Sequence, residues 1–263
     1  MEPRGFCAGV KTAINTVVRL AEKYPNETIY IKHKIVHNSE VIRELQEKYH
    51  VVFVEKLSEI PNGARVVFSA HGTPPNVYAE AKERNLKVTD ATCMLVEKVH
   101  SKAKEYAKQG VSIVLIGHNG HQEIIGTMGQ AVMHLVENTQ DVEKLNIEVN
   151  APVAYITQTT LSIYETKNIE LALRNKFPNL FFSRDDICYA TTNRQEAVMS
   201  VINKIDFLLV VGDESSSNSR RLVETAQQRG INAYLISSFK DIKSAWVLGV
   251  RSVGITSGAS APE

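Results

Sequence analysis

The stretch Pro3-Arg4-Gly5-Phe6-Cys7-Ala8-Gly9-Val10 places a cysteine between two glycines, just before a helical pattern. From Val10 onward apolar residues recur three and four positions apart, which predicts a helix that begins close to Cys7. The same arrangement returns at Asp90-Ala91-Thr92-Cys93 and at Asp186-Ile187-Cys188, each leading into a further helical pattern. These are the only cysteines of the chain, 86 and 95 residues apart. Their similar settings predict one shared function.

The composition narrows the class of protein. With 263 residues, 43% hydrophobic and 22% charged, the chain is typical of a folded globular protein. A formal net charge of +1 gives no reason to expect a nucleic-acid partner, and no apolar run is long enough to cross a membrane. An odd number of cysteines without a secretory signal pattern predicts a reducing compartment. We expect the cytoplasm, or an organelle matrix if a transit segment has been removed.

Apolar runs rich in β-branched residues alternate with helical patterns along the whole sequence. Several runs, such as 207–211, are continuously apolar, as are strands buried on both faces of a parallel sheet. The alternation predicts an α/β fold with mainly parallel sheets. Helices are expected at 38–49 and 79–85, and strands at 28–31, 51–54, 66–69, 112–116, 153–157, 207–211, 233–236 and 253–256.

The cysteine positions divide the chain into three similar lengths. We expect three small α/β units, 10–91, 92–186 and 187–263, the last completed by residues 1–9. Their cysteines would then meet at a common centre. The chain shows neither a sequence repeat nor a low-complexity linker, so the units should pack tightly.

Small, polar and often glycine-containing segments follow five of the expected strands. In open α/β sheets a ligand binds beyond the carboxyl ends of the strands. For one such loop an ordinary polar turn is the simpler interpretation. Several together predict hydroxyl, amide and backbone donors around an anion. The segments are 69–72, 117–123, 157–160, 212–219 and 257–260.

Cysteine by itself is most often a small buried apolar residue. A structural zinc site needs four ligands and usually a Cys-x₂₋₄-Cys pair, which this sequence lacks. Three thiolates suit an iron–sulfur cubane whose fourth iron has no protein ligand, since ordinary electron-transfer clusters take four cysteines. Helix N-termini would favour the thiolate form. No phosphate-binding loop for ATP and no dinucleotide fingerprint follows a strand, so electrons would come from a partner protein.

Three histidines and one glutamate lie where expected strands end or helices begin: His37, His71, His121 and Glu123. Glu123 is either an exposed acid at a helix start or a proton donor directed into the pocket, and the sequence does not decide between them. The other five histidines have no such setting, and we expect ordinary roles for them, with His134 in a sheet. They are His33, His50, His100, His118 and His134.

Ordered motifs across the chain resemble the 4-hydroxy-3-methylbut-2-enyl diphosphate reductase family. Besides the three cysteine segments, they include Val36-His37-Asn38, Ser69-Ala70-His71-Gly72, Gly120-His121-Gln122-Glu123, Thr157-Gln158-Thr159-Thr160, Ser216-Ser217-Asn218-Ser219 and Gly258-Ala259-Ser260-Ala261-Pro262-Glu263.

The resemblance implies a specific activity: reductive removal of the allylic hydroxyl to give isopentenyl and dimethylallyl diphosphate, the last step of the non-mevalonate pathway. It implies three α/β units in pseudo-threefold arrangement around a 4Fe–4S cluster held by Cys7, Cys93 and Cys188. Glu123 would donate the proton, with Thr159 relaying it beside the hydroxyl. Ferredoxin or flavodoxin would supply electrons. The diphosphate would be bound by His37, His71, His121, Ser216, Ser217, Asn218 and Ser260.

The chain departs from the family pattern at a few positions. Met94 stands where a proline is usual and Ser215 where an asparagine is usual, while Asp213 and Glu214 are expected to point away from the diphosphate. Two other functions stay open: an iron–sulfur hydro-lyase, which needs no external electrons, and a non-enzymatic cluster-based sensor.

Overall fold

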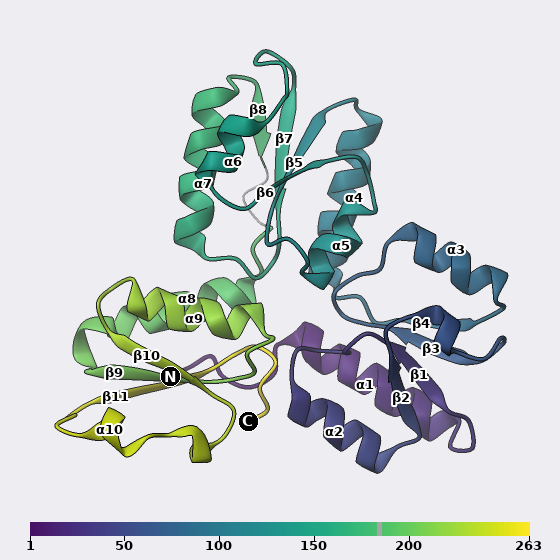
Figure 1. Cartoon of the computed structure of the whole chain (residues 1–263), viewed down its shortest axis with the longest axis horizontal. Helices are drawn as coiled ribbons and strands as arrows, with labels where there is room; N and C mark the ends of the chain where they lie inside the picture. The colour runs from purple at the N-terminus through teal and green to yellow at the C-terminus, as the bar shows by residue number, and fades with distance from the viewer. Residues whose placement is uncertain (183–185) are drawn as a thin grey trace.

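The structure, a computed structural model, describes residues 1–182 and 186–263. Three small α/β units surround a common centre and form the three lobes of the molecule in Figure 1. Within the described residues, all paired neighbouring strands run parallel to each other. Parallel neighbours need crossover connections, so helices come to cover the sheet faces. The predicted α/β class with parallel sheets is confirmed.

The first unit is built on a four-stranded sheet of order β2-β1-β3-β4. Its inner strand β3 is buried at three of its four positions, as its apolar run predicts. In chain order its elements are α1 (Ala8–Lys23), β1 (Ile29–Lys32), α2 (Ser39–Lys48), β2 (Val51–Val54), the 3₁₀ turn η1 (Leu57–Glu59), β3 (Arg65–Phe68), α3 (Pro75–Glu83) and β4 (Lys87–Asp90).

The second unit has a sheet of order β6-β5-β7-β8. All five residues of β7 are buried, because helices cover both of its faces. The elements are α4 (Met94–Lys108), β5 (Ser112–Ile116), α5 (Gln122–Met128), β6 (His134–Val136), α6 (Thr139–Lys144), β7 (Val153–Thr157), α7 (Ile163–Lys176) and β8 (Leu180–Phe182).

The third unit has a three-stranded sheet of order β10-β9-β11. The predicted apolar run at 207–211 forms its central strand. The elements are α8 (Tyr189–Val201), η2 (Ile202–Lys204), β9 (Phe207–Val211), α9 (Ser217–Gln227), β10 (Asn232–Ile236), η3 (Phe239–Asp241), α10 (Ser244–Val247) and β11 (Val253–Ser257).

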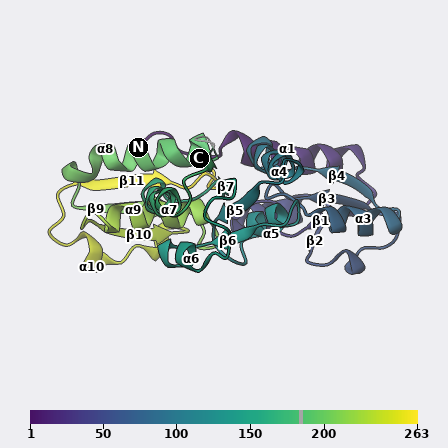
Figure 2. The ribbon, with the colours of Figure 1, turned by 90° about the horizontal axis from the view of Figure 1, so that it is seen from above.

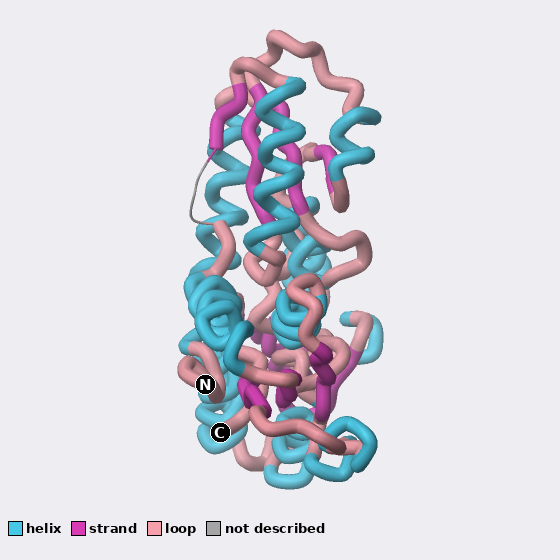
Figure 3. The backbone as a smooth tube through the Cα atoms, turned by 90° about the vertical axis from the view of Figure 1, so that its left-hand side faces the viewer, coloured by secondary structure: helices cyan, strands magenta, loops and turns pink. Residues whose placement is uncertain are grey.

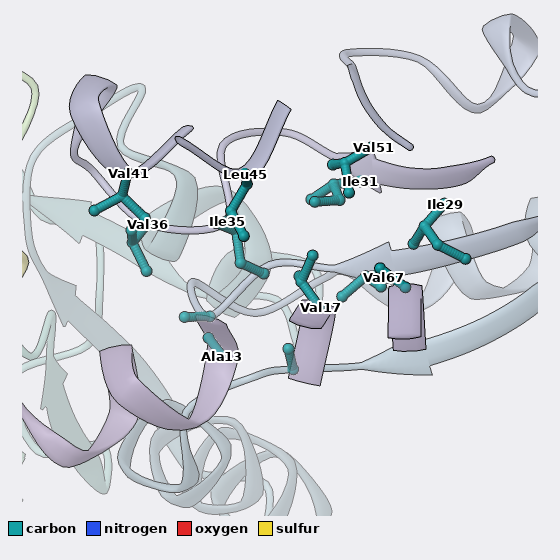
Figure 4. Close-up of a cluster of buried hydrophobic side chains, with 13 residues drawn as sticks. Ala13, Val17, Ile29, Ile31, Ile35, Val36, Val41, Leu45, Val51 and Val67 are labelled. Carbon is teal, nitrogen blue, oxygen red and sulfur yellow. The ribbon is translucent and has the colours of Figure 1, made fainter. Parts of the chain in front are cut away.

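Each unit has its own apolar core, illustrated by the first unit in Figure 4. Val17 of α1, Ile31 of β1 and Val67 of β3 are fully buried in this core, where the helix packs on the sheet. Burying one such side chain contributes about 1.5–3 kcal/mol relative to leaving it exposed. The helical spacing that begins at Val10 therefore marks the face of α1 that packs on the sheet.

The structure contains two strands that the sequence patterns did not indicate, β4 and β8, and a third, β6, of which only His134 was expected to lie in a sheet. All three lie at sheet edges, where fewer residues need be apolar. In β4 three of the four side chains are exposed. His134 does begin a strand, as expected, but its side chain is exposed.

The two chain ends meet in the third unit. The amino group of Met1 donates to the carbonyl of Ile255 at 2.8 Å. The buried guanidinium of Arg194 then joins both ends to α8, donating to the carbonyls of Gly5 at 2.7 Å and Ser257 at 3.2 Å. These bonds attach Met1 and Gly5 to the third unit. The assignment of all of residues 1–9 to that unit and the boundaries at residues 91 and 186 stay predictions.

The molecule is flat, as the two views at right angles in Figures 2 and 3 show. Helices α1, α4 and α8, which follow the three cysteines, lie toward one face, in the upper part of Figure 2. Helices α6 and α10 lie toward the opposite face. The cysteine-bearing helix starts therefore share one side of the centre.

Candidate active site

Each cysteine lies at the start of a helix and is held by the loop that follows a strand. Cys7, Cys93 and Cys188 are the N-cap residues of α1, α4 and α8. Their backbone N–H groups donate to the carbonyls of Ala259, Ala70 and Thr159 at 3.0, 3.0 and 2.9 Å. Each acceptor lies two residues beyond its strand, β11, β3 or β7. The same hydrogen bond thus recurs in all three units, which explains the threefold arrangement.

The three thiols line one cavity at the centre, the central pocket. Gly9 leaves room between two of them, because a Cβ atom there would lie 2.6 Å from Cys93 Sγ and 4.0 Å from Cys7 Sγ. Within residues 1–182 and 186–263, no three His, Cys, Asp or Glu side chains converge on one single-ion position. The three thiols line one cavity instead, with the Gly9 backbone beside two of them.

The protonation of the thiols differs from the expectation. Helix N-termini should favour thiolates, yet burial raises the pKa of Cys93, and that of Cys188 to about 11. Hydrogen bonds from backbone N–H groups lower both pKa values, but less than burial raises them. Without metal these two cysteines are therefore neutral at pH 7, and metal binding must displace their protons.

Three further helices, α2, α5 and α9, also begin beside the central pocket. They follow the strands β1, β5 and β9, one in each unit. The N-caps of α2, α5 and α9 are Asn38, His121 and Ser216. These helices bring the predicted anion-binding residues together. The centroid of the His37 ring lies 4.1 Å from that of the His71 ring and 5.3 Å from that of the His121 ring.

The histidines of this cluster are neutral in the ligand-free protein. Burial is the main cause: it lowers the pKa of His37 to about 3 and that of His121 to about 4, and it lowers the pKa of His71 well below its usual value. Neighbouring imidazoles lower these pKa values further. An anion placed among them would favour the protonated forms.

Several imidazole nitrogens have no hydrogen-bond partner within the described part of the chain. In this cluster they are both nitrogens of His37 and Nε2 of His121; Nε2 of His100 and of His118 lack partners as well. Nδ1 of His121 accepts from the backbone N–H of Glu123 at 3.2 Å, so Nε2 carries the proton of the neutral ring. Buried polar atoms without partners are costly, which points to a ligand that supplies oxygen acceptors.

Hydroxyl and amide groups from α9 and the last loop complete this side of the pocket. Ser260 Oγ donates to the carbonyl of His37 at 2.9 Å and lies 3.4 Å from Ser216 Oγ. Asn218 is buried and accepts from the backbone N–H of Ala259 at 2.9 Å. Ser217 Oγ lies 3.4 Å from the carbonyl of Thr160. The site is therefore held in shape by bonds between units far apart in sequence.

Glu123 is buried, which excludes the interpretation of an exposed acid at a helix start. It is only 3% exposed, and its carboxylate accepts from the backbone N–H of Thr159 at 2.6 Å and from Thr159 Oγ1 at 2.9 Å. Burial raises its pKa to about 7, although the two Thr159 donors lower it. A carboxyl group that is about half protonated at neutral pH can both give and take a proton.

Every predicted site residue lines the central pocket. Residues that the prediction omitted also line it, notably Thr160 and Thr191. Thr160 adjoins a predicted residue and could have been included, whereas Thr191 lies inside α8 and only the packing reveals it.

The departures from the family pattern leave the pocket lining intact. Met94 is 80% exposed, and Glu214 is exposed. Asp213 accepts from the backbone N–H and hydroxyl of Ser215 and from the backbone N–H of Ser39, and these donors hold its pKa low. It lies close enough to influence the His37 imidazole, but its oxygens are committed to these donors.

The amino-acid sequence is similar to those of known proteins along its whole length. A family model described as "LytB protein" matches residues 1–263. A 4-hydroxy-3-methylbut-2-enyl diphosphate reductase from Psychromonas ingrahamii is 49% identical over 267 aligned positions, covering 99% of this chain and 84% of the relative. The reductase of the same name from Mannheimia succiniciproducens is 48% identical with the same coverage.

Two solved structures are also similar. The E-1-hydroxy-2-methyl-but-2-enyl-4-diphosphate reductase from Plasmodium falciparum superposes with a TM-score of 0.96 at 42% identity, covering 99% of this chain and 82% of that one. A second structure, described as (E)-4-hydroxy-3-methyl-but-2-enyl diphosphate reductase, the terminal enzyme of the non-mevalonate pathway, gives a TM-score of 0.71 at 30% identity, with coverage of 99% and 92%.

Proposed function

Since the chain belongs to the LytB protein family, we propose that it reduces 4-hydroxy-3-methylbut-2-enyl diphosphate to isopentenyl and dimethylallyl diphosphate. It is an oxidoreductase of the non-mevalonate isoprenoid pathway. The observation that carries the proposal is that one cavity is lined by three thiols, by a cluster of hydrogen-bond donors suited to an anion, and by a buried carboxyl group.

The residues fit an iron–sulfur cofactor. The three thiols surround a space that Gly9 keeps free of a side chain, and their sulfurs are the soft ligands that such clusters take. We propose a 4Fe–4S cluster with Cys7, Cys93 and Cys188 as its protein ligands. When bound, it would supply electrons and Lewis-acid assistance to the departing hydroxyl.

The diphosphate would be held on the opposite wall of the pocket. His37, His71 and His121 would contribute N–H donors, and α9 would contribute its N-terminal donors and Ser216, Ser217 and Asn218. Ser260 would donate its hydroxyl in place of its bond to a backbone carbonyl. Each hydrogen bond to a charged group contributes about 1.5–3 kcal/mol, so several are needed to offset the desolvation of a diphosphate.

Glu123 and Thr159 would deliver protons. In the ionised form the Thr159 hydroxyl donates to Glu123; once Glu123 is protonated, the same contact can reverse and leave the Thr159 hydrogen free to point into the pocket. Hydroxide is a poor leaving group, so a proton must reach it as its bond to carbon breaks.

The pH dependence of kcat/KM should show this protonation. Because the proton donor must be protonated and burial raises its pKa to about 7, kcat/KM should be level below pH 7 and fall about tenfold per pH unit well above it. The pKa values of His37 and His121 lie far below this range, so their titration does not interfere. An equal fall in Glu123→Gln would exclude Glu123 as its origin.

The Gly9→Ala variant tests whether the space beside Gly9 is needed for the cofactor, independently of the stability of the fold. The new methyl group would meet Cys93 Sγ, which can rotate away in the metal-free protein but not when bound to iron. We expect iron and sulfide content to fall to less than half, while urea unfolding of the metal-free protein is unchanged or improved, since alanine is favoured in helices by about 1 kcal/mol. Thr12→Ala, at an exposed site on α1, is the control. Full iron content in Gly9→Ala would contradict the placement.

The electron donor would be a small redox protein such as ferredoxin or flavodoxin, in the cytoplasm or an organelle matrix. In the described ranges 1–182 and 186–263, the helices are too short or too polar to cross a lipid bilayer.

An anaerobic assay tests the function. Protein purified without oxygen and supplied with iron and sulfide should convert the substrate to both products only when a chemical reductant is present. Equal consumption without reductant would favour a hydro-lyase. A bound cluster without turnover under either condition would favour a sensor.

A further inference from the structure

A second cavity, the outer cavity, adjoins the central pocket. It is lined by His33, Lys34, His37, His118, Asn119, Gly120, His121, Gln122, Ser215 and Arg220. His37 and His121 line both cavities, so their two rings form the boundary between them.

The outer cavity carries positive charge. Lys34 and the exposed Arg220 belong to its lining, and none of the described lining residues is a carboxylate. Both cations act on the boundary: Lys34 contributes to the low pKa of His37, and Arg220 contributes to that of His121. The cations therefore lie within electrostatic range of the rings that face the central pocket.

The nearby acids are already engaged. Asp213 accepts from Ser39 and Ser215, and Glu137 accepts from the backbone N–H of Asn119 at 2.7 Å. These hydrogen bonds go to Ser39 and to two residues of the lining, Ser215 and Asn119. They hold the surrounding loops in place, and their charges partly oppose those of Lys34 and Arg220: Asp213 acts to raise the pKa of His37, and Glu137 acts to raise that of His118.

Imidazole nitrogens without hydrogen-bond partners line the same space. Nε2 of His118 is buried without a partner among the described residues, as are Nε2 of His121 and both nitrogens of His37. The backbone N–H of His118 donates to Gln158 at 3.1 Å, which fixes the loop that carries the ring. Fixed imidazoles beside two cations suit an anion with several oxygens.

We propose that the outer cavity is an anion-binding site that captures the diphosphate end of the substrate beside His37 and His121 before the substrate enters the central pocket. Lys34 and Arg220 attract the ligand and His118 contacts it. This inference rests on the proposed function for the identity of the ligand. A cleft lined by one sign of charge raises association rates by about 10–10³-fold, in a manner that salt removes.

The test compares Lys34→Gln/Arg220→Gln with the wild type, as cluster-loaded enzyme with a chemical reductant. At an ionic strength of about 0.01 M, where the Debye length is about 30 Å, kcat/KM should fall roughly tenfold. At about 1 M, where it is about 3 Å, the difference should shrink to less than about twofold. Because the two cations act before chemistry, the loss should reside in KM, with kcat within about twofold.

Two control variants distinguish electrostatic attraction of the substrate from a structural role of Lys34 and Arg220. Arg220→Lys keeps the charge and should retain most of kcat/KM, whereas Arg19→Gln/Lys108→Gln removes the same charge from exposed sites on α1 and α4 and should have little effect. Identical salt dependence in the wild type and the Lys34→Gln/Arg220→Gln enzyme would overturn the proposal. So would a loss of kcat that persists at high salt.

Calorimetric titration of inorganic diphosphate into the unreduced protein requires no turnover. Weaker low-salt binding by Lys34→Gln/Arg220→Gln would support the outer site even if the wild type failed to reduce the substrate. Equal binding by the two proteins would overturn the site even if the proposed reductase activity were found.

Discussion

Replacing Cys93 by serine is expected to abolish the visible absorbance of the cluster and all turnover. Serine is nearly the same size but is a poor ligand for iron in place of a thiolate. Cys93 is the N-cap residue of α4, and its thiol lines the central pocket. Serine is also a favoured N-cap residue, so the metal-free fold should be retained.

The measurement is iron and sulfide content with visible and Mössbauer spectra, made anaerobically beside unfolding of the metal-free form. Met94→Ala provides the matched control: it changes the adjacent residue, which is 80% exposed, and should leave the spectrum intact. An unchanged spectrum in Cys93→Ser would remove Cys93 from the ligand set. Loss of the folded structure in the metal-free variant would show that the thiol has a structural role instead.

The second large effect is expected for Glu123→Gln, which should slow reduction by roughly 10²–10⁴-fold, the usual range for loss of a general acid. Glutamine preserves the shape and can still accept from the Thr159 backbone N–H, but it cannot transfer a proton. Cluster content and substrate affinity should therefore stay near those of the wild type. The fall of kcat/KM above pH 7 should disappear as well.

Glu97→Gln serves as the control, since Glu97 is also a first-turn acid, on α4, but is exposed. Thr159→Ser tests the relay separately, because it retains a hydroxyl beside Glu123 and should keep most of the rate. A Glu123→Gln enzyme of near-normal rate would exclude Glu123 as the proton donor.

Local patterns were enough for much of the fold. Continuous apolar runs such as 207–211 and 153–157 predicted the buried central strands, since a strand covered on both faces must be apolar along its length. The edge strand β4 was missed for the complementary reason: with the sequence Lys87–Asp90, it is mostly exposed and has no apolar run to recognise. Expected helix ends differ by a few residues, as at 79–85 against Pro75–Glu83 for α3.

The candidate site was predicted more from ordered motifs than from physical chemistry. Sequence position alone left Glu123 equally consistent with an exposed acid, and its burial against Thr159 excluded that interpretation. His118 was given an ordinary role, yet its ring lines the outer cavity beside Arg220. In both cases the deciding neighbours lie far along the chain.

The sequence by itself determined the alternation of strands and helices, the loops that end the strands, and the cysteines at three helix starts. These features depend on residues within a few positions of one another. Only the tertiary structure decided that the cysteines share a cavity, through bonds such as Cys7 to Ala259 and Cys93 to Ala70. It also decided that burial outweighs the helix N-terminus at Cys188 and raises its pKa. Desolvation depends on atoms packed around a group from every unit, and no short stretch of sequence specifies those.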